Sequence, residues 1–454
     1  MRFRVPAALR HPLALFGMVL ASAMAVLFIV LLLLEAFGYM RNPYFGLLLF
    51  VAVPAAFVVA LLLIPIGVQL DARRRRRSPG AAPDDWPVLD LRIARQRGLV
   101  AVFVLLTVVN LVLLSTASYG AVHYMETAEF CGQVCHTTME PQFTARQSGP
   151  HARVACVSCH IGAGLGAEVE AKMAGTRQLW QLATNQVPKP VPSPVQSMRP
   201  ARDTCEQCHW PEKFHGDMVR VIREYAEDEK NTETVTPMTM HVGGGSAAFA
   251  VGSGIHWHMN LDNEVEYITT DAKREKIPYV RLRERNGTVR EYTAKGATPG
   301  QLAQGQRRRM DCTDCHNRPA HTFDFTPERA VNNAMAQGRI PRELPFIRRE
   351  ALAAITLEYA DRPAALAAIA SRLREHYKSQ PSVDAPLVER AIAGTQEVWS
   401  RNVFPAMKVK WGTYPNHIGH LDTPGCFRCH DDEHTSKDGR VIRQDCGLCH
   451  NEVQ

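Results

Sequence analysis

The sequence has no cysteine to spare for a disulfide framework. All twelve cysteines of the 454-residue chain fall into six closely spaced pairs, and each pair is followed at once by a histidine. The chain also lacks the composition of a disordered or collagen-like polymer, because 46% of its residues are hydrophobic and 21% are charged. Length and composition together predict a folded protein of two to four domains.

Lysine is absent from the first 121 residues, which contain 12 arginines and 5 acidic residues. This region therefore holds the whole net charge of +7, and the other 333 residues balance 40 basic groups against 40 acidic groups. The five arginines from Arg73 to Arg77 follow a hydrophobic stretch, which favours a role in membrane topology over nucleic-acid binding. We expect no nucleic-acid partner.

Three apolar stretches, at about residues 13–37, 44–70 and 98–119, are long enough to cross a bilayer. Arginines precede the first stretch and crowd the 71–97 loop, whereas the loop between the first two stretches contains only Arg41. The positive-inside bias therefore predicts a multi-pass protein of the bacterial inner membrane with a cytoplasmic N-terminus. Everything after about residue 122 should be periplasmic. The first stretch is too long for a signal peptide, so we interpret it as a retained anchor.

No histidine lies inside these stretches, and no charged side chain lies near their middle. The first absence excludes an axial haem ligand within the bilayer, and the second excludes a proton relay. We expect the membrane part to act as an anchor without charge translocation.

The twelve cysteines and the histidines that follow them form six motifs of the kind that attaches c-type haem. Two thiols must reach the two vinyl groups on one edge of a porphyrin, while the adjoining histidine places a nitrogen beneath the iron. A zinc site would need no histidine after every pair, so we predict six covalent haems. The cysteines are Cys131, Cys135, Cys156, Cys159, Cys205, Cys208, Cys312, Cys315, Cys426, Cys429, Cys446 and Cys449, and the proximal histidines are His136, His160, His209, His316, His430 and His450. The first motif, CGQVCH, is a rarer variant with three residues between its cysteines.

Histidine is plentiful enough to supply the distal ligands as well. Eighteen histidines leave twelve after the proximal set, and three of these, near the membrane or on a helix, look like bystanders. We predict six distal ligands, most of which lie close to a motif or to Trp257. They are His151, His256, His258, His321, His420 and His434. His215, His241 and His417 stay open as alternatives. Met139 is a further candidate, since a thioether ligand would raise the potential of the first haem.

The segments FCGQVCHTTMEP, SGPHARVACVSCH and RDTCEQCH follow the third apolar stretch. Over residues 100–215 the chain thereby resembles the NapC/NirT family of membrane-anchored multihaem quinol dehydrogenases. The resemblance implies oxidation of quinol or menaquinol from the quinone pool and delivery of electrons to a periplasmic redox partner. It also implies that His151 is the distal ligand of the haem whose proximal ligand is His209. The usual family member has one span and four haems, whereas this chain has three spans and six motifs.

In the family, a lysine on the helix after the second motif helps to form the quinol pocket. Lys172, in AEVEAKMAGTRQLW, matches that position. The acidic partner expected a few residues beyond it is missing, although Glu168 and Glu170 lie just before it. The resemblance therefore implies a quinol pocket with Lys172 as its cationic group and Glu168 and Glu170 beside it.

We predict a mainly α protein with a three-helix membrane anchor, a periplasmic multihaem domain of sparse short helices, and a small inserted β-hairpin or sheet. Asn286-Gly287 marks a hairpin turn within the β-like region. The expected regions are the anchor (1–121), a NapC/NirT-like domain with three haems (122–231), a β-rich insert (232–300), the fourth haem segment (301–325), a helical insert (326–402) and a C-terminal haem pair (403–454).

The leading hypothesis is a quinol-oxidising electron-transfer protein. Two alternatives stay open: a terminal multihaem reductase of a small oxyanion or nitrogen compound, and an electron-transfer subunit of a larger respiratory complex. The first alternative needs an open distal site and nearby acid or base groups. The sequence also leaves open whether the chain forms a homo-oligomer.

Overall fold

The computed structural model describes residues 11–36, 48–76, 91–134, 136–162, 164–195, 199–210, 214, 216–244, 254–260, 263–380 and 383–452. The chain divides into two compact units, Met1–His136 and Thr137–Gln454. The first contains the three apolar stretches, and the second contains five of the six motifs.

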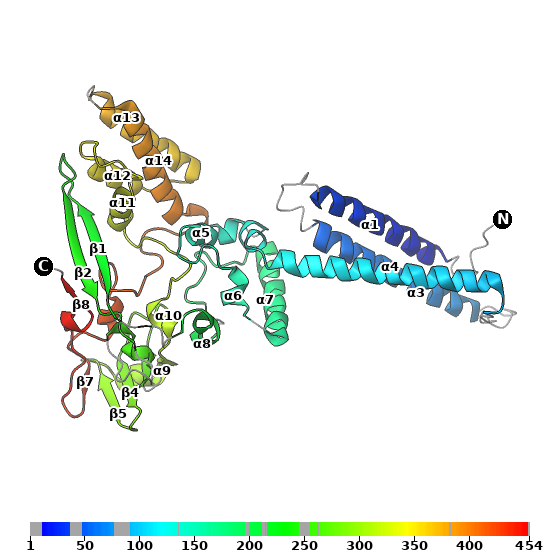
Figure 1. The fold of residues 1–454 in the computed structure, drawn as a ribbon, viewed down its shortest axis with the longest axis horizontal. Helices are drawn as coiled ribbons and strands as arrows, with labels where there is room; N and C mark the ends of the chain where they lie inside the picture. The colour runs from blue at the N-terminus through cyan, green and yellow to red at the C-terminus, as the bar shows by residue number, and fades with distance from the viewer. Residues whose placement is uncertain are drawn as a thin grey trace. The chain divides into compact units, whose positions relative to one another are not determined.

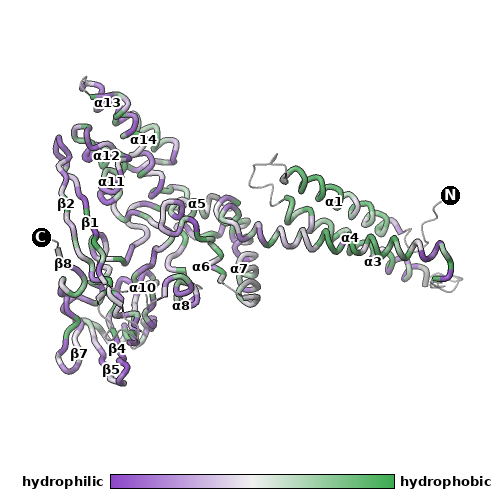
Figure 2. The backbone as a smooth tube through the Cα atoms, in the orientation of Figure 1, coloured by the Kyte–Doolittle hydropathy of each residue, from purple (hydrophilic) through white to green (hydrophobic). Residues whose placement is uncertain are grey.

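The first unit consists of three long apolar helices, α1 (Pro12–Ala36), α3 (Val53–Arg76) and α4 (Ala94–Met125). All three are long and apolar enough to cross a membrane, and Figure 2 shows their hydrophobic colouring. A π-helical turn, η2 (Leu48–Ala52), leads into α3. Helices α1 and α3 approach closely, since a Cβ atom on Gly67 would lie 2.5 Å from the backbone nitrogen of Ala14. Small residues allow this kind of contact between helices in a membrane.

The second unit is built largely from short helices and turns, as expected for a chain that leaves space for cofactors (Figure 1). Among the described helices of this unit that begin before residue 300, only α7 is longer than twelve residues. These elements are α5 (His136–Gln147), α6 (Cys156–His160), α7 (Leu165–Ala183), α8 (Ala201–Thr204), η4 (Cys205–Gln207), η6 (Ile255–Met259), α9 (Pro299–Gln304), α10 (Cys312–Cys315), η7 (Pro405–Met407), η8 (Gly425–Arg428) and η9 (Cys446–Leu448). A further π-helical turn, η3 (Phe130–Val134), precedes α5 in the first unit.

Two antiparallel sheets occupy the second unit. The first has the order β1-β2-β8, from Met218–Tyr225, Glu233–Met240 and His450–Glu452. The second has the order β6-β3-β4-β5-β7, from Gln306–Arg309, Asn263–Thr269, Tyr279–Glu284, Val289–Thr293 and Thr435–Ser436. Asn286-Gly287 forms the turn between β4 and β5, and Gly287 has a φ of +84°. The strands are not confined to the predicted 232–300 insert. Strands β7 and β8, which come from the C-terminal haem segment, complete the two sheets.

Four helices form a separate core after the fourth motif: α11 (Pro327–Ala336), α12 (Ile347–Ile355), α13 (Arg362–Lys378) and α14 (Ala385–Asn402). Asp361 caps α13 by accepting a hydrogen bond from the backbone of Ala364, and Pro363 follows within the first turn. Leu373 and Trp399 are fully buried between these helices. Tyr225 of β1 belongs to the same core, so the helices pack on the first sheet. The prediction of a mainly α fold with small sheets is confirmed.

Candidate functional site

Five of the haem-attachment motifs lie on single helical turns. The CxxC segments coincide with α6, η4, α10, η8 and η9, or lie within one residue of them, and the proximal histidine ends or follows each turn. Residues three apart on a helical turn share a face, so both thiols of a motif can address one porphyrin edge. In the first motif, Cys131 lies on η3, whereas Cys135 and the side chain of His136 lie outside the described residues.

The structure brings five proximal histidines beside a second histidine ring. The two rings of each pair come from different segments, and their centres lie 5.8 to 6.2 Å apart. The pairs are His151 with His209 (5.9 Å), His160 with His321 (6.1 Å), His256 with His316 (6.2 Å), His258 with His430 (5.8 Å) and His420 with His450 (6.0 Å).

This spacing fits an iron between two imidazoles. Two metal–nitrogen bonds of about 2 Å, with about 1 Å from each nitrogen to its ring centre, add up to about 6 Å. Direct ring stacking would instead bring most centres closer, as it does for His256 on Phe214 at 4.5 Å. Five pairs with one spacing, each beside a CxxC turn, therefore suit five haems.

Four of the non-proximal rings have Nδ1 hydrogen-bonded to a backbone carbonyl. Nδ1 of His151 lies 2.9 Å from the carbonyl of Pro319, and Nδ1 of His321 lies 3.0 Å from that of Gln142. Nδ1 of His256 likewise lies within hydrogen-bond distance of the Val242 carbonyl, and Nδ1 of His258 within that of the Ile255 carbonyl. A carbonyl can only accept, so Nδ1 carries the proton and Nε2 keeps the lone pair that a metal requires. Burial lowers the pKa of His321 to about 4, which favours the neutral ring.

A single short turn serves two motifs. His256 and His258 lie two residues apart on η6, and they face His316 of motif four and His430 of motif five. Trp257 between them packs edge-on against His258 at 5.6 Å. Any movement of η6 would therefore shift the partners of both motifs together.

The thiols of motifs two to six lie close enough for neighbouring motifs to influence one another's pKa. Burial raises the pKa of Cys159 of motif two, and Cys205 of motif three adds to that increase. A hydrogen bond from Cys312 of motif four lowers the pKa of the Cys205 thiol. Burial raises the pKa of Cys315 to about 12, with a contribution from Cys426 of motif five. Cys426 also raises the pKa of Cys449 in motif six, after burial. Each of motifs two to five therefore has its successor in the sequence as an electrostatic neighbour.

Motifs four and five are joined by a buried charged cluster. Asp314, inside the motif-four turn, accepts hydrogen bonds from Tyr267 (2.5 Å) and Arg274 (3.0 Å) and lies 3.6 Å from Arg308. Arg428, inside the motif-five turn, donates to the backbone carbonyls of Asp314, Arg274 and Gly425. Residues that lie between the cysteines of motifs four and five therefore hold the two turns together through hydrogen bonds and ion pairs. Sequence reasoning missed this role, although a charged residue inside a turn that must face a cofactor is a usable signal.

Three of the remaining histidines face no proximal ring in the described part of the chain. His434, predicted as a ligand, is buried and has both nitrogens occupied: Nδ1 contacts Asp431 at 2.9 Å and Nε2 lies 2.7 Å from the Ile277 carbonyl. In this arrangement the two hydrogen bonds fasten the loop after motif five. His417 Nε2 lies 3.0 Å from the carbonyl of Lys273, and His241 lies 3.0 Å from Asp217. His215 lies outside the described residues.

The residues of the expected quinol pocket are only partly described. Lys172, Glu168 and Glu170 lie on α7, and Glu170 is exposed. The side chains of Lys172 and Glu168 lie outside the described part of the structure. Met139 is on α5, one turn after His136.

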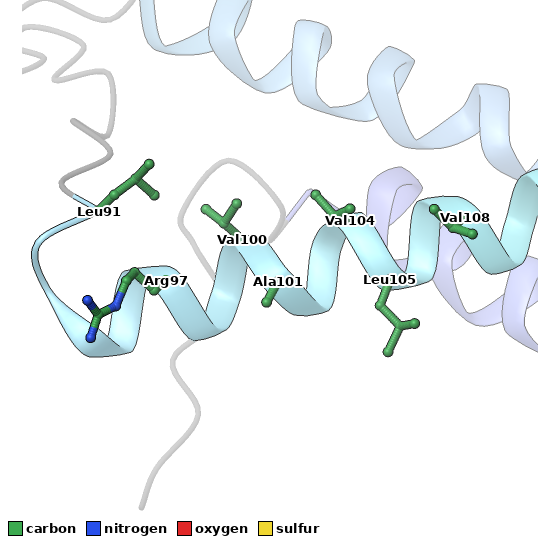
Figure 3. A pocket seen from close by; sticks show the side chains of 7 residues that line it. All are labelled: Leu91, Arg97, Val100, Ala101, Val104, Leu105 and Val108. Carbon is green, nitrogen blue, oxygen red and sulfur yellow. The ribbon is translucent and has the colours of Figure 1, made fainter.

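An apolar hollow lies along α4 in the first unit (Figure 3). Val100, Val104 and Val108 point to one side of the helix, Leu105 points to the other, and Arg97 lies at its start. No haem-attachment residue lines this hollow. Because the side chains of α4 are largely exposed, the hollow is a surface suited to lipid or to another apolar molecule.

Comparison with known proteins gives two matches that agree. Residues 94–191 match the model of the NapC/NirT cytochrome c family, N-terminal region. The chain is also 40% identical over 450 residues to the cytochrome c-type protein ImcH of Geobacter sulfurreducens, covering 98% of this chain and 88% of that protein. No solved structure matches the chain.

Proposed function

The chain belongs to the NapC/NirT family of c-type cytochromes, a membrane-anchored multihaem type with covalently bound haem c, and from this premise we propose a specific role. The protein oxidises quinol at the periplasmic face of the inner membrane and relays electrons to a periplasmic acceptor. It carries six haems, and its N-terminus is cytoplasmic.

The observation that carries this proposal is the set of five histidine pairs with ring centres about 6 Å apart. We assign His151 to motif three, His321 to motif two, His256 to motif four, His258 to motif five and His420 to motif six. With two histidines available at each of these five motifs, a bound haem would supply one-electron transfer rather than substrate binding. The described residues thus favour an electron relay over a terminal reductase, which needs an open distal site.

The sequence order of the motifs supports the direction of the relay. The cysteines of each motif from two to five share an electrostatic influence on pKa with those of the next motif. The first motif lies eleven residues or fewer after α4, so quinol oxidation belongs at that end. Motif six, which lies on the first sheet through β8, belongs at the acceptor end.

At the quinol end we assign Lys172 to the pocket, with Glu168 and Glu170 as acidic neighbours on α7. A lysine ammonium that donates to a quinol oxygen would stabilise the anion formed as the proton leaves. The carboxylates suit the role of proton acceptors.

The test is reduction of the purified holo-protein by a menaquinol analogue, followed by the haem absorbance. We expect quinol to reduce haem without added partner, and intact mass to exceed that of the polypeptide by six haems. No reduction by quinol alongside full reduction by dithionite would reject quinol oxidation. A mass increase of five haems would mean that the CGQVCH site is empty.

A further inference from the structure

Arg318 has no anionic partner. It lies two residues after His316 and three before His321, in the segment NRPAH. Its Nη2 donates to the hydroxyl of Ser193 at 2.5 Å, and its Cζ lies 4.3 Å from the centre of the Tyr414 ring. Its Nε is buried and has no hydrogen-bond partner. Among the described residues, no carboxylate forms an ion pair with it.

Other buried guanidinium groups of the unit face a carboxylate or carbonyls, and Arg308, whose Nε also lacks a hydrogen bond, lies 3.6 Å from Asp314. Arg274 pairs with Asp314, and all three donor nitrogens of Arg428 are hydrogen-bonded to carbonyls. A buried charge without a counter-ion costs several kcal/mol. Arg318 therefore fits a site in which an anion outside the polypeptide completes the pairing.

The anion that the site is built to receive is a carboxylate of the cofactor. Each covalent haem carries two propionates, and a guanidinium binds a carboxylate through a planar fork of two donors. With Nη2 held by Ser193 and one face covered by Tyr414, the free donor edge of Arg318 includes Nε.

The neighbours of Arg318 indicate which haem this is. The Tyr414 ring that Arg318 covers lies 5.1 Å from the ring of Phe323, two residues after His321. His316 is two residues away in sequence, but its ring faces His256. Arg318 is thus directed toward the His160–His321 pair of motif two.

We propose that Arg318 binds a propionate of the haem attached at Cys156 and Cys159. The inference rests on the proposed ligand pair His160 and His321. A propionate anion stabilises the oxidised iron, so a paired guanidinium raises the reduction potential of this haem. Arg318 is then a cofactor-binding residue that sets the potential near the start of the relay.

The test is a mediated redox titration of the whole holo-protein, in which wild type is compared with R318Q and R318K. No quinol is used, so the outcome is independent of whether the protein oxidises quinol. We expect R318Q to lower the reduction midpoint potential of one haem by at least about 59 mV, which corresponds to a tenfold change in a one-electron reduction equilibrium. R318K keeps the point charge and should shift the same haem less.

The matched control is R146Q. Arg146 also influences His321, but its Nε and Nη2 both donate to the carbonyl of Val154 at an exposed position. It should leave every midpoint unchanged. Wild-type midpoints in R318Q with full haem content, or an equal shift in R146Q, would overturn the proposal. If R318Q does not accumulate, a structure of the wild-type holo-protein decides: a propionate oxygen within hydrogen-bond distance of Arg318 Nε supports the assignment, and its absence refutes it.

Discussion

At the scale of single residues, the partners of the two ring nitrogens separate two uses of histidine. Nδ1 of His258 lies 2.9 Å from the Ile255 carbonyl, and the ring faces His430. His434 lies four residues after His430. Its Nδ1 is hydrogen-bonded to Asp431 and its Nε2 to the Ile277 carbonyl. The first ring keeps a nitrogen for a metal, and the second fastens a loop.

This contrast predicts different outcomes for H258A and H434A. H258A should convert one haem to a high-spin form, visible by electron paramagnetic resonance, because that iron loses its second imidazole. H434A should keep every haem low-spin but lose about 2–4 kcal/mol of stability, since two buried hydrogen bonds disappear. Thermal unfolding measures the second effect. A high-spin signal in H434A alone would reverse the assignment.

Lys172 allows a separate test at the quinol end. K172M removes the ammonium but keeps the length of the side chain. We expect quinol-driven haem reduction to slow by roughly 10²- to 10³-fold, the range seen when one charge-stabilising donor is removed. Haem content and reduction by dithionite should be unchanged. The control is K189M, which removes an exposed lysine in the loop after α7. Quinol kinetics like those of wild type in K172M would place the pocket elsewhere, with Gln178 a further residue to test.

At the scale of elements, the turns of motifs four and five act as one structure, because Asp314 gathers the buried charges between them. D314A leaves Arg274 and Arg308 without their carboxylate and Tyr267 without its acceptor. We expect a loss of about 3–5 kcal/mol in the free energy of unfolding.

The comparison for D314A is E389A. Glu389 pairs with Arg374 on the exposed surface of α13 and α14 at 2.7 Å, and such pairs contribute about 0–1 kcal/mol. Thermal unfolding can be followed by circular dichroism in the haem absorption region. The melting temperature should be far below that of wild type for D314A and close to it for E389A. Equal melting temperatures would mean that the two turns are held by other contacts.

Local patterns predicted the elements that local chemistry determines. The three apolar stretches, the Asn286-Gly287 turn and the buried face of Ile369, Leu373 and Tyr377 all follow from length, turn type or periodicity. The pairing of strands β7 and β8 with strands from far earlier in the chain follows from tertiary packing, which local patterns do not predict. The facing of His420 and His450 is of the same kind, because proximity in sequence says nothing about which ring faces another.

At the scale of the whole molecule, the spans and the haem unit have separate tasks. In the described parts of α1, α3 and α4, no histidine or charged side chain lies in the central turns. We therefore expect turnover in proteoliposomes, with quinol inside the bilayer and a soluble oxidant outside, to generate no membrane potential. A voltage-sensitive dye measures this directly. A potential that an uncoupler collapses would contradict the anchor role of the spans.

The pairing of His160 with His321 has a consequence for biosynthesis. In the other four pairs the partner ring precedes its motif, so a chain exported from its N-terminus has already delivered that ring when the motif emerges. Motif two is the exception, because its partner follows 161 residues later. On the proposed assignment, a haem at this site would wait with one open face until residue 321 has crossed the membrane. We therefore expect its closure to be a late step in maturation, and a chain truncated before residue 321 to expose this iron to oxidants.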